Sequence, residues 1–107
     1  MNTLAKQIKE IAKQNPQGFT IYLPSLEPVR NGWVIANIKT QNCFGDAGLQ
    51  KALKFAMTYN RIIGGWFDNG NYYFDASIVE PNKEKALILK ELHKQIAIIN
   101  LETLEIA

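Results

Sequence analysis

The sequence contains only one cysteine and one histidine in 107 residues. A single cysteine excludes an intramolecular disulfide and a metal cluster built from cysteines alone, and it is typical of a reducing compartment. A single histidine leaves little material for a zinc site or for a cysteine–histidine pair. We therefore expect a cytoplasmic protein without a metal or another cofactor.

Charge of one sign and long apolar runs are also scarce. The net charge is +2, which is too small to indicate nucleic-acid binding on bulk grounds. No apolar run approaches the roughly 18 residues of a membrane-spanning helix, and the first residues lack the apolar core of a signal peptide. We expect no membrane contact. The apolar fraction of 47% predicts one ordered domain over residues 1–107.

The residues that are present indicate a β-hairpin in the segment 61–79. Aromatic and β-branched runs flank Asn69 and Gly70, a pair that suits a type I′ turn because both central residues need positive φ. The two-residue period assigns four side chains to the expected core face: Tyr72, Phe74, Ala76 and Ile78. Tyr73 and Asp75 fall on the opposite face.

Further elements follow from periodicity and from turn residues. Helical spacing predicts helices near 3–14 and 47–59, the second capped by Asp46. A third helix is predicted to begin after Pro81, with Asn82 as its candidate cap. Its expected apolar stripe consists of Ile88, Leu89 and Leu92. Strands are predicted at 19–23, 33–38 and 96–99, and residues 18–38 are expected to form a second hairpin.

The resulting order, α-β-β-α-β-β-α-β, predicts an α+β fold. Two hairpins favour a mainly antiparallel sheet with helices packed on one face. One parallel pairing, and so a mixed sheet, stays open because the last strand follows a helix. An unpaired edge at 96–99, or in the tail after it, would allow a homodimer by strand addition.

Catalytic arrangements are few. Cys43 lies near a helix start, where a thiolate can be stabilised, but it would have to meet His93 in space to act as a nucleophile. A buried thiol and a surface histidine are the commoner explanations. Asp68 and Asp75 flank the turn and would be a carboxylate pair only if both face one site. We predict that the protein is not an enzyme.

Nucleic-acid binding is an alternative. Aromatic side chains on an exposed sheet face can stack with bases when basic groups lie nearby. The residues considered for such a surface are Trp33, Trp66, Tyr73, Arg61 and the helix lysines Lys6, Lys9 and Lys13. Aromatic residues on a half-buried sheet usually belong to the core, and lysines usually solvate a helix.

Several short motifs resemble a recurrent pattern. They are Gly18-Phe19-Thr20, Thr40-Gln41, Phe44-Gly45, the run from Gly64 to Ser77, Lys83-Glu-Lys-Ala-Leu87 and the run from Lys94 to Leu101. The pattern is similar to that of small uncharacterised proteins, and of domains of larger polyvalent proteins, carried by phages and other mobile elements. The resemblance implies a mobile element acting inside a bacterial cell, and it transfers no catalytic residue.

The sequence thus favours a non-enzymatic phage or mobile-element protein that binds a host macromolecule. By analogy, its partner would be a host protein or ribonucleoprotein, and the effect would be inhibition of a defence nuclease such as a CRISPR effector. The expected contact residues lie in loops and on the outer face of the hairpin: Asn42, Trp66, Asp68, Asn71, Tyr73 and Asp75. A single-stranded nucleic-acid-binding protein is the runner-up.

Overall fold

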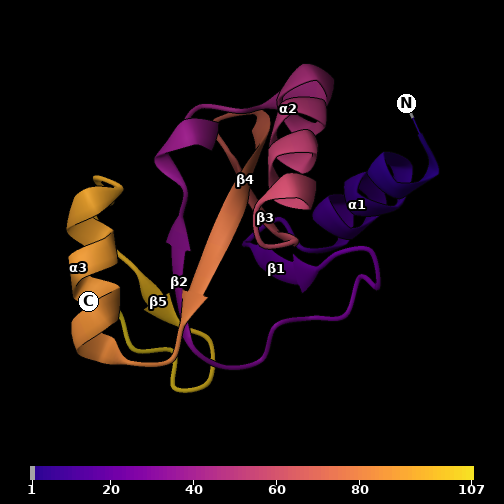
Figure 1. Ribbon diagram of the computed structural model, residues 1–107. Coiled ribbons are helices and arrows are strands. Elements are labelled where there is room, and N and C mark those ends of the chain that lie inside the picture. Colours follow the sequence, from indigo (N-terminus) through magenta and orange to yellow (C-terminus); the bar gives the residue numbers. More distant parts are fainter. Residues whose placement is uncertain (1) are drawn as a thin grey trace.

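The computed structural model describes residues 2–107 and has the predicted order of elements (Figure 1). The helices are α1 (Thr3–Gln14), α2 (Gly45–Thr58) and α3 (Lys83–Leu92). The strands are β1 (Phe19–Tyr22), β2 (Trp33–Ala36), β3 (Ile62–Asp68), β4 (Asn71–Glu80) and β5 (Ile99–Asn100), and a 3₁₀ turn spans Ile38–Thr40. No helix in this described part is long and apolar enough to cross a membrane.

The strands form one sheet in the order β1-β3-β4-β2-β5, and every pairing is antiparallel. The predicted α+β fold is confirmed, and the parallel pairing left open for the last strand does not occur. The first half of β4 pairs with β3, and its second half pairs with β2. Strand β4 therefore joins two parts of a curled sheet.

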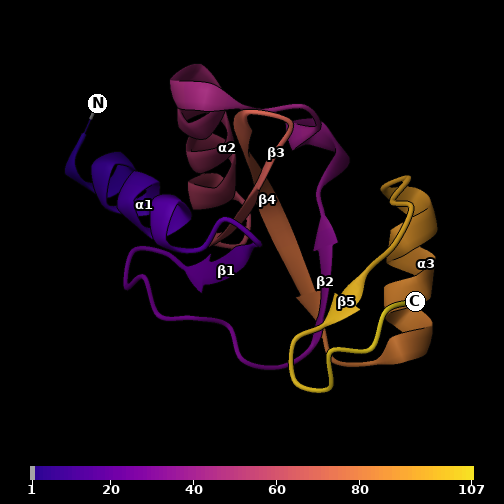
Figure 2. The same ribbon diagram turned by 180° about the vertical axis from the view of Figure 1, so that it is seen from behind.

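The central hairpin is confirmed. Its turn residues Asn69 and Gly70 have φ values of 49° and 84°, as a type I′ turn requires. The second hairpin, predicted for residues 18–38, is wrong. Strand β1 pairs with β3 and β2 pairs with β4, so the connection between them runs along the edge of the molecule (Figure 2). Strands β1 and β2 thus pair with the two edges of the central hairpin and not with each other.

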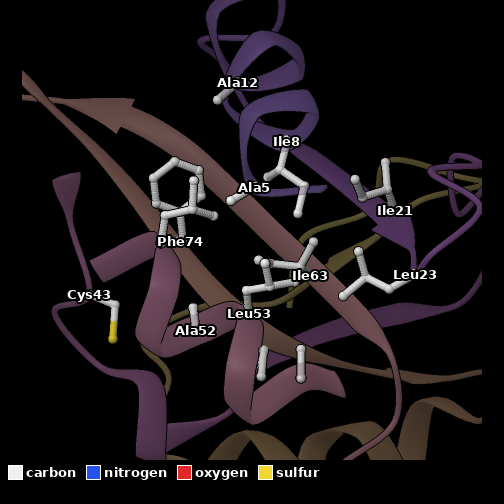
Figure 3. Close-up of a cluster of buried hydrophobic side chains, with 13 residues drawn as sticks. Ala5, Ile8, Ala12, Ile21, Leu23, Cys43, Ala52, Leu53, Ile63 and Phe74 are labelled. Atoms are coloured by element: carbon white, nitrogen blue, oxygen red, sulfur yellow. The ribbon is translucent and has the colours of Figure 1, made fainter. Parts of the chain in front are cut away.

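One large core lies between the first two helices and β1, β3 and β4. It contains thirteen buried residues. Ala5 and Ile8 of α1 point toward Ile63 of β3 and Leu53 of α2 in Figure 3. Phe74 lies in the same cluster, so the predicted core face of the hairpin is confirmed there.

A smaller core lies under α3, at the other end of the sheet (Figure 1). It contains four buried residues: Trp33, Ile35, Ala86 and Ile98. Because Ile35 pairs with Ile78 and Ala76 pairs with Ile63, this core lies on the same face of the sheet as the large one. The predicted stripe of α3 is wrong in part, since Leu89 packs against this core while Ile88 and Leu92 are exposed.

The C-terminal segment differs most from the prediction. Strand β5 begins at Ile99, and Ile96 is fully exposed rather than buried in a strand. Residues 98–100 form backbone hydrogen bonds with residues 105–107. The outer side of β5 is thus already paired with the tail, so β5 itself offers no free edge for strand addition. The homodimer stays a prediction. The β1 edge is covered similarly, by residues 27–29.

Candidate functional site

Two pockets lie on the face of the sheet opposite the helices. Their cavity volumes are about 510 and 430 Å³. Both are lined by Trp66 of β3, Asp75 of β4 and Gln95 of the C-terminal segment, so we treat them as two lobes of one groove centred on Asp75. The C-terminal segment, which runs from the end of α3 past β2 (Figure 2), forms the second wall.

Two glycines of β3 keep the floor of the groove open. A Cβ atom on Gly64 would lie 2.8 Å from the Ser77 hydroxyl oxygen, and one on Gly65 would lie 2.6 Å from the Tyr73 carbonyl oxygen. A pair of glycines inside a strand can mark either a bulge or a close backbone approach. The register with β4 is continuous through both glycines, so the close approach is correct.

Asp75 occupies the floor of the groove. Its side chain is 7% exposed, and its Oδ1 accepts a hydrogen bond of 2.6 Å from the Ser77 hydroxyl. Burial raises the pKa of the Asp75 carboxyl to about 6, and the Ser77 hydrogen bond opposes this change. The sequence placed Asp75 correctly on the outer face of the hairpin, but the C-terminal segment lies against that face at Asp75, and the side chain is buried there.

A surface that we call the aromatic tip borders the groove. It consists of Phe44, Trp66 and Tyr73. The Trp66 and Tyr73 rings are stacked, with centroids 5.4 Å apart, and Phe44 lies 5.7 Å from Tyr73. Trp66 and Tyr73 are cross-strand partners on the face that carries Asp75. Trp66 is 41% exposed, so the tip presents aromatic surface to solvent.

The structure brings most of the predicted contact residues together. Five of the six line the same lobe of the groove: Asn42, Trp66, Asp68, Tyr73 and Asp75. The sixth, Asn71, pairs with Asp68 beside the turn and lines neither lobe. Sequence reasoning missed Phe44 and Gln95, because neither belongs to the central hairpin, where alternation marks the outward side chains.

Of the residues considered for nucleic acid, Trp66 and Tyr73 are stacked on each other, but the structure does not bring the basic residues to them. Trp33 is buried beneath α3, where the Lys83 ammonium lies 5.5 Å from its ring centroid, so its predicted role in base stacking is wrong. Arg61 directly precedes β3, whereas Trp66 lies near the hairpin turn. The two residues are therefore separated by most of a strand, on the order of 15 Å.

Two of the helix lysines are paired with acids. Lys9 contacts Asp46 at 2.8 Å and Lys13 contacts Glu10 at 3.5 Å, while Lys6 is exposed. Asp46 was predicted to cap α2, and that prediction is wrong: Phe44 holds the cap position without a side-chain hydrogen bond. Asp46 lies in the first turn instead, where its charge still suits the helix N-terminus.

Cys43 and His93 are each held by other contacts. Cys43 is buried in the large core, and burial raises the pKa of its thiol, which disfavours a thiolate. His93 Nδ1 accepts a hydrogen bond of 3.0 Å from the Ile38 backbone N–H. Residues 2–107 contain no group of three or more metal-ligating His, Cys, Asp or Glu side chains.

Comparison with known protein families, with curated proteins and with solved structures finds no match to this chain. The resemblance to proteins of mobile elements therefore stays a prediction. Function has to be inferred from the groove and the aromatic tip, since they combine a cavity, a buried carboxyl group and exposed aromatic rings on one face.

Proposed function

We propose that this protein acts by binding a macromolecule through the aromatic tip and the adjoining groove, and not by catalysis. The observation that carries the proposal is the stacked pair of Trp66 and Tyr73 at the mouth of the groove, extended by Phe44. Partly exposed aromatic side chains beside a pocket supply much of the binding energy in protein interfaces.

The charges around the groove favour a protein over a nucleic acid. Asp68 and Asp75 line the groove, and Lys94 is the one basic residue among its lining residues in the described chain. Phosphate groups would be repelled by the two carboxylates, and binding to a nucleic-acid backbone depends on several lysines or arginines. A protein surface that offers apolar and basic groups fits this composition better.

The sequence motifs resemble those of mobile-element proteins, and this genetic setting limits the class of partner further. A mobile-element protein works in the bacterial cytoplasm, where the partner would be a host protein or ribonucleoprotein. Occupying the surface of a defence nuclease, such as a CRISPR effector, would inhibit that enzyme without any chemistry by the small protein. An inhibitor of this kind needs a rigid contact surface, and the register of β3 and β4 holds the aromatic tip in place.

Affinity capture from a bacterial host lysate, with and without nuclease treatment, tests the proposal. Trp66→Ser is the test variant and Phe67→Ser is its matched control. The two residues are neighbours, their exposed fractions are 41% and 43%, and they lie on opposite faces of the hairpin. We expect a specific host protein to be retained after nuclease treatment, to be lost with Trp66→Ser and to persist with Phe67→Ser.

Two outcomes would contradict the protein-binding proposal. Equal retention by both variants would show that the aromatic tip is not the contact surface. Loss of all retained material after nuclease treatment, together with steep weakening as salt increases, would instead support the alternative of single-stranded nucleic-acid binding through stacking on Trp66 and Tyr73.

A further inference from the structure

The Asp75 carboxylate is a buried group with few partners of its own. In residues 2–107 the Ser77 hydroxyl is the only side chain that donates a hydrogen bond to it, and the bond is to Oδ1. No fully buried side-chain oxygen or nitrogen of the described chain lacks a hydrogen-bond partner. The second carboxylate oxygen therefore has contact with the groove, both lobes of which Asp75 lines.

The described chain does not neutralise this carboxylate. Its three ion pairs join Lys9 to Asp46, Lys13 to Glu10 and Lys83 to Glu105, and none includes Asp75. The other ionisable groups that line the smaller lobe with Asp75 are Cys43, Asp68, Tyr73 and Lys94. Lys94 forms no ion pair within residues 2–107. An ionised carboxylate with one neutral donor in an apolar setting is costly, and a cation would remove that cost.

The walls of the groove suit an organic cation. Ala36 and Ala97 line both lobes, and Leu104 lines the larger one, so much of the wall is apolar. Trp66 lines both lobes, and the face of an indole ring attracts ammonium and guanidinium groups within about 6 Å. The larger lobe, at about 510 Å³, lies in the size range of small-molecule sites.

We propose that the groove binds an ammonium or guanidinium group on an apolar stem, with the cation against Asp75 and the stem along Trp66. The proposal deepens the proposed function and rests on it for the source of the cation, which would be a lysine or arginine side chain of the partner protein. A free organic amine has the same chemistry. The experiment below separates the two sources.

The test is an NMR titration of the full chain labelled with ¹⁵N. The probes are N-acetyl-arginine amide, its neutral counterpart N-acetyl-citrulline amide, and n-butylamine. We expect N-acetyl-arginine amide to cause saturable shifts of the Gly64 and Gly65 amides and of the Trp66 indole N–H. Half-saturation is expected on the order of 1 mM, as for one small group binding without the rest of its protein.

Asp75→Asn keeps the size of the side chain and removes its charge, and it should weaken binding about tenfold or more. Asp68→Asn, a change at the rim of the same lobe, should weaken binding much less. Amide dispersion reports whether each variant is folded. Should Asp75→Asn fail to fold, comparison of the Asp68→Asn protein at pH 7.5 and pH 5 decides, because protonation of Asp75 removes the charge and must weaken binding at pH 5.

Several results would overturn the cation site. They are equal shifts with the citrulline probe, unchanged affinity in Asp75→Asn, or binding at pH 5 as strong as at pH 7.5. If they occur while Trp66-dependent capture of a host protein persists, the cation site fails and the proposed function stands. Saturable binding of n-butylamine at tenfold lower concentration than the arginine probe, without capture of any partner, supports the cation site with a free amine and overturns the proposed function.

Discussion

The two ends of the sheet are built differently. At one end, α1 and α2 cover β1, β3 and the first half of β4, and thirteen buried residues form the core. At the other end, α3 covers β2 and the second half of β4 over a core of only four buried residues. We call these the two-helix end and the single-helix end. They share one strand and one face of the sheet, yet they bury very different amounts of apolar side chain.

The difference shows how one strand can serve two purposes. The two-helix end supplies most of the hydrophobic stabilisation and so can hold the aromatic tip rigidly. The single-helix end leaves Ile88 and Leu92 exposed at 62% and 66%, and its C-terminal segment forms a wall of the groove rather than filling it. The groove lies where the two ends meet, so its shape depends on both.

The largest expected effect comes from shortening matched isoleucines in the two cores. Ile63 of the two-helix end and Ile35 of the single-helix end are both fully buried. We expect Ile63→Ala to lower the free energy of unfolding by about 4 kcal/mol and Ile35→Ala by about 2 kcal/mol, because a thin core relaxes around a cavity more easily. Urea unfolding followed by circular dichroism measures both. An equal or larger loss for Ile35→Ala would break the comparison.

The next effect concerns pH and the carboxyl group between the two ends. The folded-state pKa of Asp75, about 6, lies above its ordinary value of 3.8, so the folded state holds this proton more tightly than the unfolded state does. Stability should therefore fall as pH rises from about 4 to about 6, by about 3 kcal/mol for this group, and stay lower above pH 6.

Asp75→Asn isolates that contribution. The variant should be more stable than the wild type at pH 7.5, and the two should converge near pH 4, where the wild-type carboxyl is protonated. Thermal unfolding at several pH values measures the difference. Parallel profiles for the two proteins would show that ionisation of Asp75 does not oppose folding.

A smaller effect on the free energy of unfolding is expected at the hairpin turn, which positions the aromatic tip of the two-helix end. Gly70 has φ of 84°, and a Cβ added there would meet no atom within 4 Å. Gly70→Ala should therefore cost about 1 kcal/mol through backbone strain alone. Gly45→Ala, also at positive φ in open space, is the control at a helix start. A loss above about 3 kcal/mol at Gly70 would indicate contacts that the structure lacks.

The smallest effect is expected on the exposed side of α3. Ile88→Gln and Leu92→Gln should each change the free energy of unfolding by no more than about 0.5 kcal/mol, because neither side chain is in a core. Leu89→Gln on the same helix is the matched control, and it should cost more, since Leu89 packs against the smaller core. Equal losses at all three positions would mean that the single-helix end is packed more completely than described.

Sequence patterns identified the local features of the fold well. Asn69 and Gly70 predicted their turn because few residue pairs adopt positive φ twice in succession. Asn82 was predicted as the cap of α3, and its side chain accepts a hydrogen bond from the Lys85 backbone N–H. Alternation in β4 placed Phe74 inward and Tyr73 outward. Each of these signals lies within a few residues of the feature that it predicts.

Such local signals do not predict which strands far apart in the chain pair with each other. A β1–β2 hairpin was expected, but β1 pairs with β3 and β2 pairs with β4. Local sequence does not specify which of several possible strands a given strand will pair with. The fate of Asp75 is the clearest example. Its outward direction followed from alternation, whereas its burial depends on residues 95–106, which contribute to the opposite wall of its pocket.

Local sequence patterns were sufficient to predict the class of fold, the central hairpin, the order of the elements and five residues that line the groove. These depend on backbone preferences and side-chain periodicity, which act over short distances. Local patterns did not predict the strand order, the two unequal cores, the exposed stripe on α3 or the groove itself. Those features arise where segments far apart in the chain compete to cover the same apolar surface, and that competition is settled by packing across the whole molecule.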